Sequence, residues 1–317
     1  MFRTRNAALT CVRTSAMAYY LGIDGGGTKT RCVLGDETVV LAKAMTGGSN
    51  IIRVGEAQAR EAIHNGIQQV CAGARISPNQ IRAICIGAAG ASRPEILSKI
   101  RNVVIETAAI DPTRIEVAGD SVIALEAAFG MGAGVIAIAG TGSIVYGRDA
   151  AGHTARAGGW GFAISDEGSG HWIGRRTVSA ILSAGDQGRE TALTALVLQA
   201  WKIRTGDELV LHANATPPPD FPRLFPVVLR AAGEGDSIAR EILAAAGAEL
   251  AGLAAMVIRR LAPANMLPVA MTGSVFRQSL DVRQVFYRTL HVNFPGIEVR
   301  EDLADPVKGA LARARRI

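Results

Sequence analysis

The segment DGGGTKT at residues 24–30 combines residue types that bind phosphate. Glycines allow consecutive N–H groups to turn toward an anion, and threonine and lysine add donors for phosphate oxygens. Asp24 is placed to hold a metal ion, directly or through water. The alternative is an ordinary hairpin turn, in which paired glycines are common but an acid, hydroxyls and an amine are not required. We therefore favour a phosphate site formed by Asp24, Gly25, Gly26, Gly27, Thr28 and Lys29.

The same pattern returns about 115 residues later, where the apolar run 135–139 leads into a Gly-Thr-Gly-Ser turn and the return strand 143–148. A third glycine turn follows the apolar run 269–271. Turns of this kind can each present backbone N–H groups to a polar ligand. The sequence thus predicts two similar α/β halves around a polyphosphate, with phosphate contacts from Gly140, Thr141, Gly142 and Ser143 and a further backbone contact to a polar ligand from the third turn, at Gly273 and Ser274.

Asp120 stands between a predicted buried strand, 115–118, and a predicted helix, 121–129. An aspartate at this point is frequently a helix N-cap. It can equally be a general base that accepts a proton from an attacking hydroxyl. Spacing alone slightly favours the cap, and both interpretations stay open.

The glycine-rich segment 158–169 carries a tryptophan and two acids, which suit sugar C–H surfaces and hydroxyls. An equally weighted alternative is a loop and cap before a helix that begins near Ser169, with Trp160 in the local core. The segment 47–50 is a turn by default, and its spacing does not establish Asn50 as a ligand contact.

The elements that would position these turns follow from the apolar periodicity. The pattern predicts antiparallel strands over 19–24, 31–34 and 39–44, buried parallel strands over 81–88 and 115–118, and helices over 54–74 and from Pro94. The second half is mainly helical after its first strands and is broken by the prolines at 217–219. Its last elements are predicted as helices over 236–261 and 275–292, strands over 269–271 and 297–300, and a terminal helix from Asp305.

The charge of the chain argues against a nucleic-acid partner. The 317 residues hold 34 basic and 28 acidic side chains, but seven of the basic ones lie in residues 1–18 and 307–317, which contain no acid. The body of the chain is nearly neutral, without a basic stripe interleaved with aromatic residues. A hydrophobic share of 49% excludes a disordered chain, and the apolar run 250–258 is too short to span a membrane.

Residues 1–18 are rich in Arg, Ser and Thr and lack acids, which is typical of a transit peptide or of a start codon assigned too early. We favour the second explanation and exclude this leader from the fold. No C-x-x-C pair or zinc spacing is present, so we expect reduced thiols and a cytoplasmic protein. The four cysteines are Cys11, Cys32, Cys71 and Cys85.

Together, the motifs GIDGGGTKT, IAGTGS, GGWG with SDEGSG, and MTGSV resemble the sugar kinase, hsp70 and actin superfamily. They are most similar to its N-acetylglucosamine kinase and BadF/BadG/BcrA/BcrD ATPase branch, including bacterial glucosamine kinases. The resemblance covers about residues 19 to 313. It implies an α/β fold of two RNase-H-like (actin-like ATPase) domains, 19–124 and 125–304, with a cleft between them and a helix at 305–317 that packs back on the first domain.

The resemblance further implies ATP and Mg²⁺ as cofactors, a homodimer and no membrane partner. It makes Asp120 the base for the 6-hydroxyl of an amino sugar, most directly N-acetylglucosamine, and adds Ala232 to the nucleotide contacts. It places the sugar on Asn50, Asp120, Gly159, Trp160 and Asp166, and the presence of Trp160 favours the acetylated sugar.

Three other functions are compatible with this branch. One is a glucosamine kinase, and another is an ATPase activator of a dehydratase, which holds an iron–sulfur cluster on cysteines at a dimer interface. The third is a sugar-sensing regulator, but such relatives carry a helix-turn-helix and a zinc cysteine cluster, and neither pattern occurs in this sequence.

Overall fold

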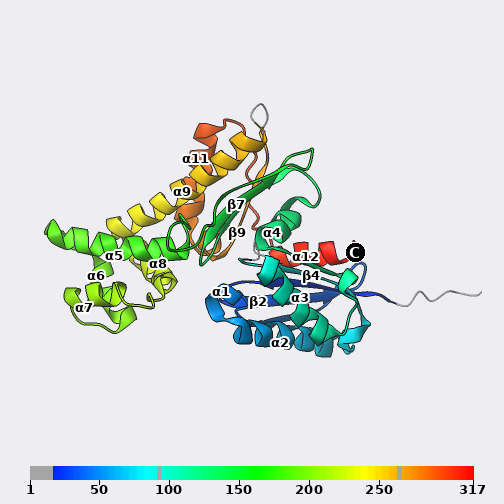
Figure 1. Ribbon diagram of the computed structural model, residues 1–317. Helices are drawn as coiled ribbons and strands as arrows, with labels where there is room; N and C mark the ends of the chain where they lie inside the picture. Colours follow the sequence, from blue (N-terminus) through cyan, green and yellow to red (C-terminus); the bar gives the residue numbers. More distant parts are fainter. Residues whose placement is uncertain (1–16, 91–93, 263–265) are drawn as a thin grey trace, which may run out of the picture.

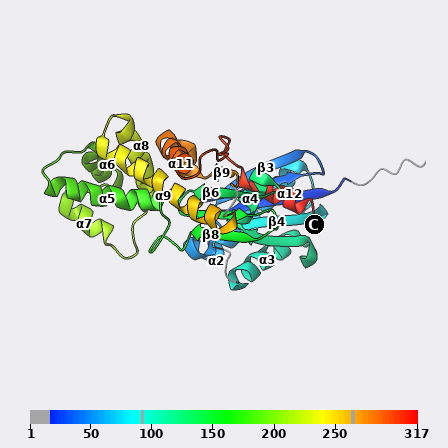
Figure 2. The same ribbon diagram turned by 90° about the horizontal axis from the view of Figure 1, so that it is seen from above.

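The computed structural model describes residues 17–90, 94–262 and 266–317, which form two β-sheets with helices packed on them (Figures 1 and 2). The strand orders are β3-β2-β1-β4-β5 and β8-β7-β6-β9. Each sheet combines an antiparallel three-stranded meander with parallel pairing on the meander's first strand. This repeat confirms the predicted α/β fold with two related halves. Of the predicted leader, residues 1–16 lie outside the described residues.

The first sheet is buried on both faces. Its strands are β1 (Tyr19–Gly25), β2 (Lys29–Gly35), β3 (Val40–Gly47), β4 (Ile81–Ala88) and β5 (Ile115–Gly119). Helices α2 (Glu56–Ala74) and α3 (Pro94–Ala108) cover one face, and α4 (Asp120–Phe129) and α12 (Pro306–Ala314) lie on the other (Figure 1). Because successive strand residues point to opposite faces, Leu21 packs toward α2 and α3 while Tyr20 packs toward α12.

The terminal helix α12 approaches the first sheet so closely that glycine is required at the contact. A Cβ on Gly22 of β1 would lie 2.3 Å from the Leu311 nitrogen, and one on Gly309 would lie 2.0 Å from the Ile123 carbonyl oxygen. Only residues without a side chain allow backbone-to-backbone packing at this distance. The C-terminus therefore packs against the N-terminal sheet.

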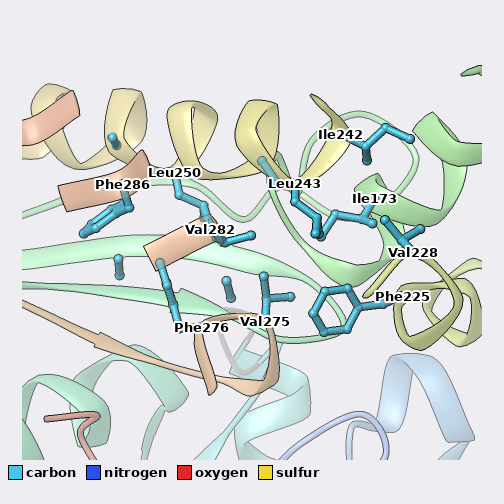
Figure 3. Close-up of a cluster of buried hydrophobic side chains, with 14 of the residues drawn as sticks. Ile173, Phe225, Val228, Ile242, Leu243, Leu250, Val275, Phe276, Val282 and Phe286 are labelled. Atoms are coloured by element: carbon cyan, nitrogen blue, oxygen red, sulfur yellow. The ribbon is translucent and has the colours of Figure 1, made fainter. Parts of the chain in front are cut away.

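The second half is a smaller sheet with a larger helical part. Its strands are β6 (Gly134–Ala139), β7 (Ser143–Arg148), β8 (Thr154–Gly158) and β9 (Val269–Thr272). Its helices are α5 (Gly170–Asp186), α6 (Ala192–Trp201), α7 (Gly206–Ala213), η3 (Phe221–Leu224), α8 (Phe225–Gly233), α9 (Ser237–Leu261), α10 (Ser274–Gln278) and α11 (Leu280–Asn293). Figure 3 shows the core between them, in which Leu243 and Leu250 of α9 face side chains of α5, α8 and α11.

Helix α9 is long and apolar enough to cross a membrane by length and composition, with a mean hydropathy of 1.7 over 18 residues. The sequence predicted this helix, but its uninterrupted apolar run, 250–258, did not show an apolar length sufficient to cross a membrane, because Arg240, Glu241 and Glu249 interrupt the apolar residues. In the fold, 61% of that window is buried inside the protein. Its apolar face packs on α11 and on the second sheet, as expected for the core helix of a globular domain.

Two predicted elements differ from the structure, and one strand was not predicted. The single helix expected over 275–292 is two helices, because the Ser279 hydroxyl caps the second one by accepting the Val282 N–H at 3.2 Å. The strand expected over 297–300 is only an isolated bridge between Val269 and Val299. Strand β8 was not anticipated, since its short sequence, TARAG, carries no strong strand pattern.

Helix α4 links the two halves. Its Ile123 belongs to the core under α12, whereas Ala124 and Leu125 pack with Ile136 and Ala270 of the second sheet. A domain boundary between residues 124 and 125 stays a prediction, because this helix contributes to both cores. Three short helices complete the first half: α1 (Ile51–Val54), η1 (Pro78–Gln80) and η2 (Pro112–Arg114).

Candidate active site

Strand ends bring the predicted site residues to one edge of each sheet. In the first sheet, Gly25 is aligned with Ala88, and Ala88 is aligned with Gly119. This register places Asp24 and Asp120 at the same edge, although they are 96 positions apart. In the second sheet, Ile138 is aligned with Thr272, so the turns after β6 and β9 also lie side by side.

The first glycine turn is tight and keeps N–H groups free. The Gly26 N–H donates to the Lys29 carbonyl at 3.0 Å, and the Gly26 carbonyl accepts the N–H groups of Ser49 and Asn50. Within the described residues, the N–H groups of Gly27 and Thr28 have no hydrogen-bond partner. Two adjacent free amides beside the exposed Lys29 are a suitable anion site.

The second turn has a similar arrangement. The Gly140 N–H donates to the Gly142 carbonyl at 2.9 Å, and the N–H groups of Thr141 and Gly142 lack a partner in the part of the chain that the structure describes. The start of α5 holds this turn in place, because the Gly170 and His171 N–H groups donate to the carbonyls of Gly140 and Thr141. The hydroxyl of Ser143, a residue predicted to contact phosphate, is buried and already donates a hydrogen bond to the Glu167 carbonyl at 2.7 Å.

The third turn adjoins the second. Gly273 has a φ of +107°, and a Cβ on it would lie 2.1 Å from the Ala139 carbonyl oxygen, so only glycine fits between β9 and β6. The Ser274 hydroxyl lies 3.9 Å from the position of a Cβ on Gly140. Ala232 lies elsewhere in its half, buried in α8, where its carbonyl accepts from Gly235 N–H and Arg240 Nε.

Asp120 is the first residue of α4, and Gly119 is the N-cap. The N-cap interpretation of Asp120 is therefore wrong, although its Oδ1 does accept the Ser121 N–H at 2.8 Å. The pKa of Asp120 is raised to about 6, because burial and then the charge of Asp24 raise it more than nearby backbone N–H groups and Arg156 lower it. A carboxylate with this pKa is largely ionised at neutral pH and still accepts a proton readily.

Asp24 belongs to an ionic chain at the first turn. Its Oδ2 lies 3.1 Å from Arg31 Nη2, which also lies 2.6 Å from Asp305 Oδ1. Burial raises the pKa of Asp24, Arg31 lowers it, and the charge of Asp305 raises it. Oδ1 of Asp24 has no hydrogen-bond partner among the described residues, so one carboxylate oxygen remains for a metal ion or its water shell.

Besides Asp120, four residues were predicted to bind the sugar but not the nucleotide, and the structure does not bring all of them together: Asn50, Gly159, Trp160 and Asp166. The Asn50 Oδ1 accepts the Ile52 N–H at 3.1 Å as the N-cap of α1, and its side chain lies beside Gly90. Trp160 is 67% exposed, so it is not part of the local core, and the Arg156 guanidinium stacks 4.0 Å from its ring centroid. Gly159 accepts a hydrogen bond from Arg156 through its carbonyl.

Asp166 lies at the second turn. Its Oδ2 lies 2.8 Å from the position of a Cβ on Gly142, and Asp166 itself adopts a φ of +69°. Burial raises the pKa of this carboxyl, and the N–H groups of Ser143 and Gly161 lower it. The carboxylate therefore supports the turn, and Gly142 must lack a side chain to admit it.

The sequence profile of the BadF/BadG/BcrA/BcrD ATPase family matches residues 21–312. The chain belongs to this family. It is 32% identical to an N-acetylmuramic acid/N-acetylglucosamine kinase of Clostridium acetobutylicum over 304 residues, which cover 94% of this chain and 99% of the relative. It is 30% identical to an N-acetyl-D-glucosamine kinase of Dictyostelium discoideum, over 92% and 96% of the two chains.

Solved structures agree with this membership. A candidate N-acetylglucosamine kinase from Chromobacterium violaceum superposes with a TM-score of 0.73 at 29% identity, over 94% of this chain and 99% of the other. A ROK family glucokinase from Streptomyces griseus, with a TM-score of 0.56 at 17% identity, shares the fold alone. As a member of an ATPase family, this chain uses ATP, which fits the free amides of its glycine turns.

Sequence reasoning missed several charged residues at the site of this family member. Arg31 and Asp305 are 274 positions apart, and Arg53 and Asp220 are 167 apart, so no local pattern could have paired them. Arg156 could have been found from the sequence, because it lies two residues before the GGWG motif.

Proposed function

We propose that this chain transfers the terminal phosphoryl group of ATP to the 6-hydroxyl of an amino sugar, giving N-acetylglucosamine 6-phosphate from N-acetylglucosamine. The observation that carries the proposal is the position of Asp120, at the strand edge that also holds the first glycine turn, with a pKa of about 6. The names of the Clostridium and Dictyostelium relatives support the choice of sugar.

In this mechanism Asp120 accepts the proton of the attacking hydroxyl. Burial keeps its pKa far enough above the ordinary value for efficient proton transfer, and Arg156 and two backbone N–H groups keep it ionised near neutral pH. The Ser121 N–H holds Oδ1, so Oδ2 is the oxygen that would face the hydroxyl.

The glycine turns bind and orient the polyphosphate. The free N–H groups of Gly27, Thr28, Thr141 and Gly142 supply donors from both halves, and Lys29 adds a positive charge. Asp24 would hold Mg²⁺ through its free Oδ1, and the ion would neutralise phosphate charge. We further place the adenosine near Gly273 and Ser274, and keep Ala232 of α8 among the expected nucleotide contacts.

The sugar would lie on Asn50, Gly159, Trp160 and Asp166. Three of them lie in or beside the segment 159–164, which is mostly exposed and would have to be covered when a substrate binds in order to exclude water. Closure of the two domains would serve the same purpose, because open water would otherwise accept the phosphoryl group. A homodimer is the oligomeric state that we expect.

A glucosamine kinase is the second candidate. The observation in its favour is a glucosamine kinase of Vibrio cholerae that is 30% identical over 241 residues, although this match covers only 74% of the chain. A dehydratase activator is less suitable, because Cys32, Cys71 and Cys85 are all buried in the first half.

The test is a coupled assay of ADP release with N-acetylglucosamine, glucosamine, N-acetylmannosamine, N-acetylmuramic acid and glucose. N-acetylglucosamine should give the highest kcat/KM. Asp120→Asn should lower kcat by about 100-fold or more while sugar binding is retained. The matched control is Asp111→Asn, the same change at an exposed aspartate that caps η2. Absence of turnover with every sugar, while ATP still binds, would contradict the proposal.

A further inference from the structure

Arg53 connects the first glycine turn with the second half of the molecule. It lies in the last turn of α1, and its Nη2 is 3.3 Å from Oδ1 of Asp220, the residue that precedes η3. The two residues are 167 positions apart and belong to different halves. This is therefore an ion pair between the domains, at the level of the phosphate turns.

The Arg53 side chain lies directly against the first turn. From the position of a Cβ on Gly27, the distances are 3.0 Å to Cδ, 3.6 Å to Nη1 and 3.7 Å to Nε of Arg53. Gly27 is also one of the two residues whose N–H groups are free. A guanidinium thus stands beside the amides that are suited to phosphate.

Asp220 uses only one of the five donors of this guanidinium. Within residues 17–90, 94–262 and 266–317, Nε and Nη1 of Arg53 have no hydrogen-bond partner, and these are the two nitrogens nearest to Gly27. The planar fork can therefore keep its contact with Asp220 while it donates to a phosphate oxygen.

The second turn faces the same ion pair. Phe221, next to Asp220, packs edge-on to the His171 ring at 5.2 Å, and the His171 N–H donates to the Thr141 carbonyl. The pKa of His171 is lowered to about 4, because burial and then the charges of Arg175 and Arg53 lower it more than the charge of Asp220 raises it. The Arg53–Asp220 pair, which touches the first turn at Gly27, is thus connected to the Thr141 turn through Phe221 and His171.

The pair contributes little to stability. Its side chains are 34% and 46% exposed, and solvent-exposed ion pairs of this kind add little to the free energy of unfolding. An arginine at this position is better explained by what its unused donors can bind.

We infer that Arg53 is a polyphosphate ligand of this enzyme, held over the first glycine turn by Asp220. The inference rests on the proposed use of ATP at these turns and extends it to a cationic contact from α1. It assigns Asp220 as a positioning residue, which acts on the nucleotide through Arg53.

The experiment compares the binding of ATP and of adenosine by calorimetry, in the absence of sugar. Arg53→Met should weaken ATP binding by about 10- to 100-fold, as expected for a charge-assisted hydrogen bond, and leave adenosine binding unchanged. Arg53→Lys should fall between Met and the natural residue, because an ammonium cannot hold Asp220 and a phosphate oxygen in the same planar geometry. The matched control is Arg60→Met, which removes an exposed ion pair between Arg60 of α2 and Glu106 of α3.

A double-mutant cycle tests the part played by Asp220. Asp220→Asn should weaken ATP binding about threefold in the natural background and have no effect in the Arg53→Met background. Equal weakening of ATP and adenosine by Arg53→Met would overturn the inference, since it would indicate a structural effect. Unchanged ATP binding would overturn it as well. Because no sugar is present, failure of this test is distinguishable from failure of the proposed sugar phosphorylation.

Discussion

Arg31 and Asp305 are 274 positions apart, and Arg31 Nη2 lies 2.6 Å from Asp305 Oδ1. The same nitrogen lies 3.1 Å from Oδ2 of Asp24 at the first glycine turn. The start of the terminal helix is thereby linked to the carboxylate that we assign to the metal. Asp305 makes no side-chain cap bond to α12, so its contact with Arg31 is separable from helix capping.

Asp305→Ala should therefore affect the nucleotide site more than the stability of the fold. We expect the KM for ATP to rise several-fold. Arg31 would keep its ion pair with Asp24 but lose the one with Asp305, which helps to hold the guanidinium beside Asp24. The free energy of unfolding should fall by about 1 kcal/mol or less, since both side chains are partly exposed. Steady-state kinetics and thermal unfolding measure the two effects, with Asp302→Ala, an exposed aspartate three positions earlier, as the control. Equal kinetics in the two variants would show that the link is dispensable.

The pH dependence of kcat/KM should report Asp120. With a pKa of about 6 and a role as base, activity should fall about tenfold per unit as the pH decreases below 6. The folded-state pKa lies above the ordinary value, so the folded protein binds this proton more tightly than the unfolded chain does. The contribution of this group to stability is thus greatest at low pH and is lost as the pH rises through 6. Asp120→Asn should accordingly unfold at the same or a higher temperature at pH 7, despite its lost turnover.

Arg156 should adjust the same pH profile without being required for the fold. The charge of Arg156 lowers the pKa of Asp120, so Arg156→Met should move the acidic limb of the kcat/KM profile to higher pH. Arg156→Lys keeps the charge and should leave the limb close to its natural position. The other charge known to act on this carboxyl, Asp24, works in the opposite direction. A profile that falls in amplitude with an unchanged midpoint would indicate that Arg156 acts only through its stacking on Trp160.

Two glycine substitutions should have opposite effects on stability. Gly273→Ala places a Cβ 2.1 Å from the Ala139 carbonyl oxygen at a φ of +107°, so we expect a loss of several kcal/mol or a failure to fold. Gly252 lies inside α9, with no atom within 4 Å of its Cβ position, so Gly252→Ala should stabilise the protein by about 0.5–1 kcal/mol. Denaturant unfolding measures both. A stable Gly273→Ala variant would mean that β6 and β9 can separate at the site.

The cysteines of the described fold should be unreactive. Burial raises the pKa of Cys32 to about 12 and that of Cys71 to about 11, and it raises that of Cys85 further. In a Cys11→Ser variant, we therefore expect no thiol to react with Ellman's reagent in the native protein and three to react after unfolding. Iron or sulfide that co-purified with the natural protein would instead favour the dehydratase activator.

Local sequence was sufficient to predict the glycine turns and the strands that lead to them. A glycine after a buried strand is a local requirement, so the turns at Gly25, Gly140 and Gly273 were predictable, and the family resemblance added the order in which they occur. Local periodicity also predicted most helices. It failed at Ser279, where a hydroxyl cap ends one helix and starts another, and at 297–300, where pairing depends on a distant strand.

Which charged side chains contact one another at the site depends on the tertiary fold. Strand register brings Asp24 and Asp120 to one edge, and the return of α12 brings Asp305 to Arg31. The approach of η3 to α1 brings Asp220 to Arg53. These pairs join residues 96 to 274 positions apart, and no spacing rule encodes them because electrostatic contact depends on distance in space. The chemistry of the glycine turns is therefore local in origin, whereas the charges that adjust it come from the packing of the two halves.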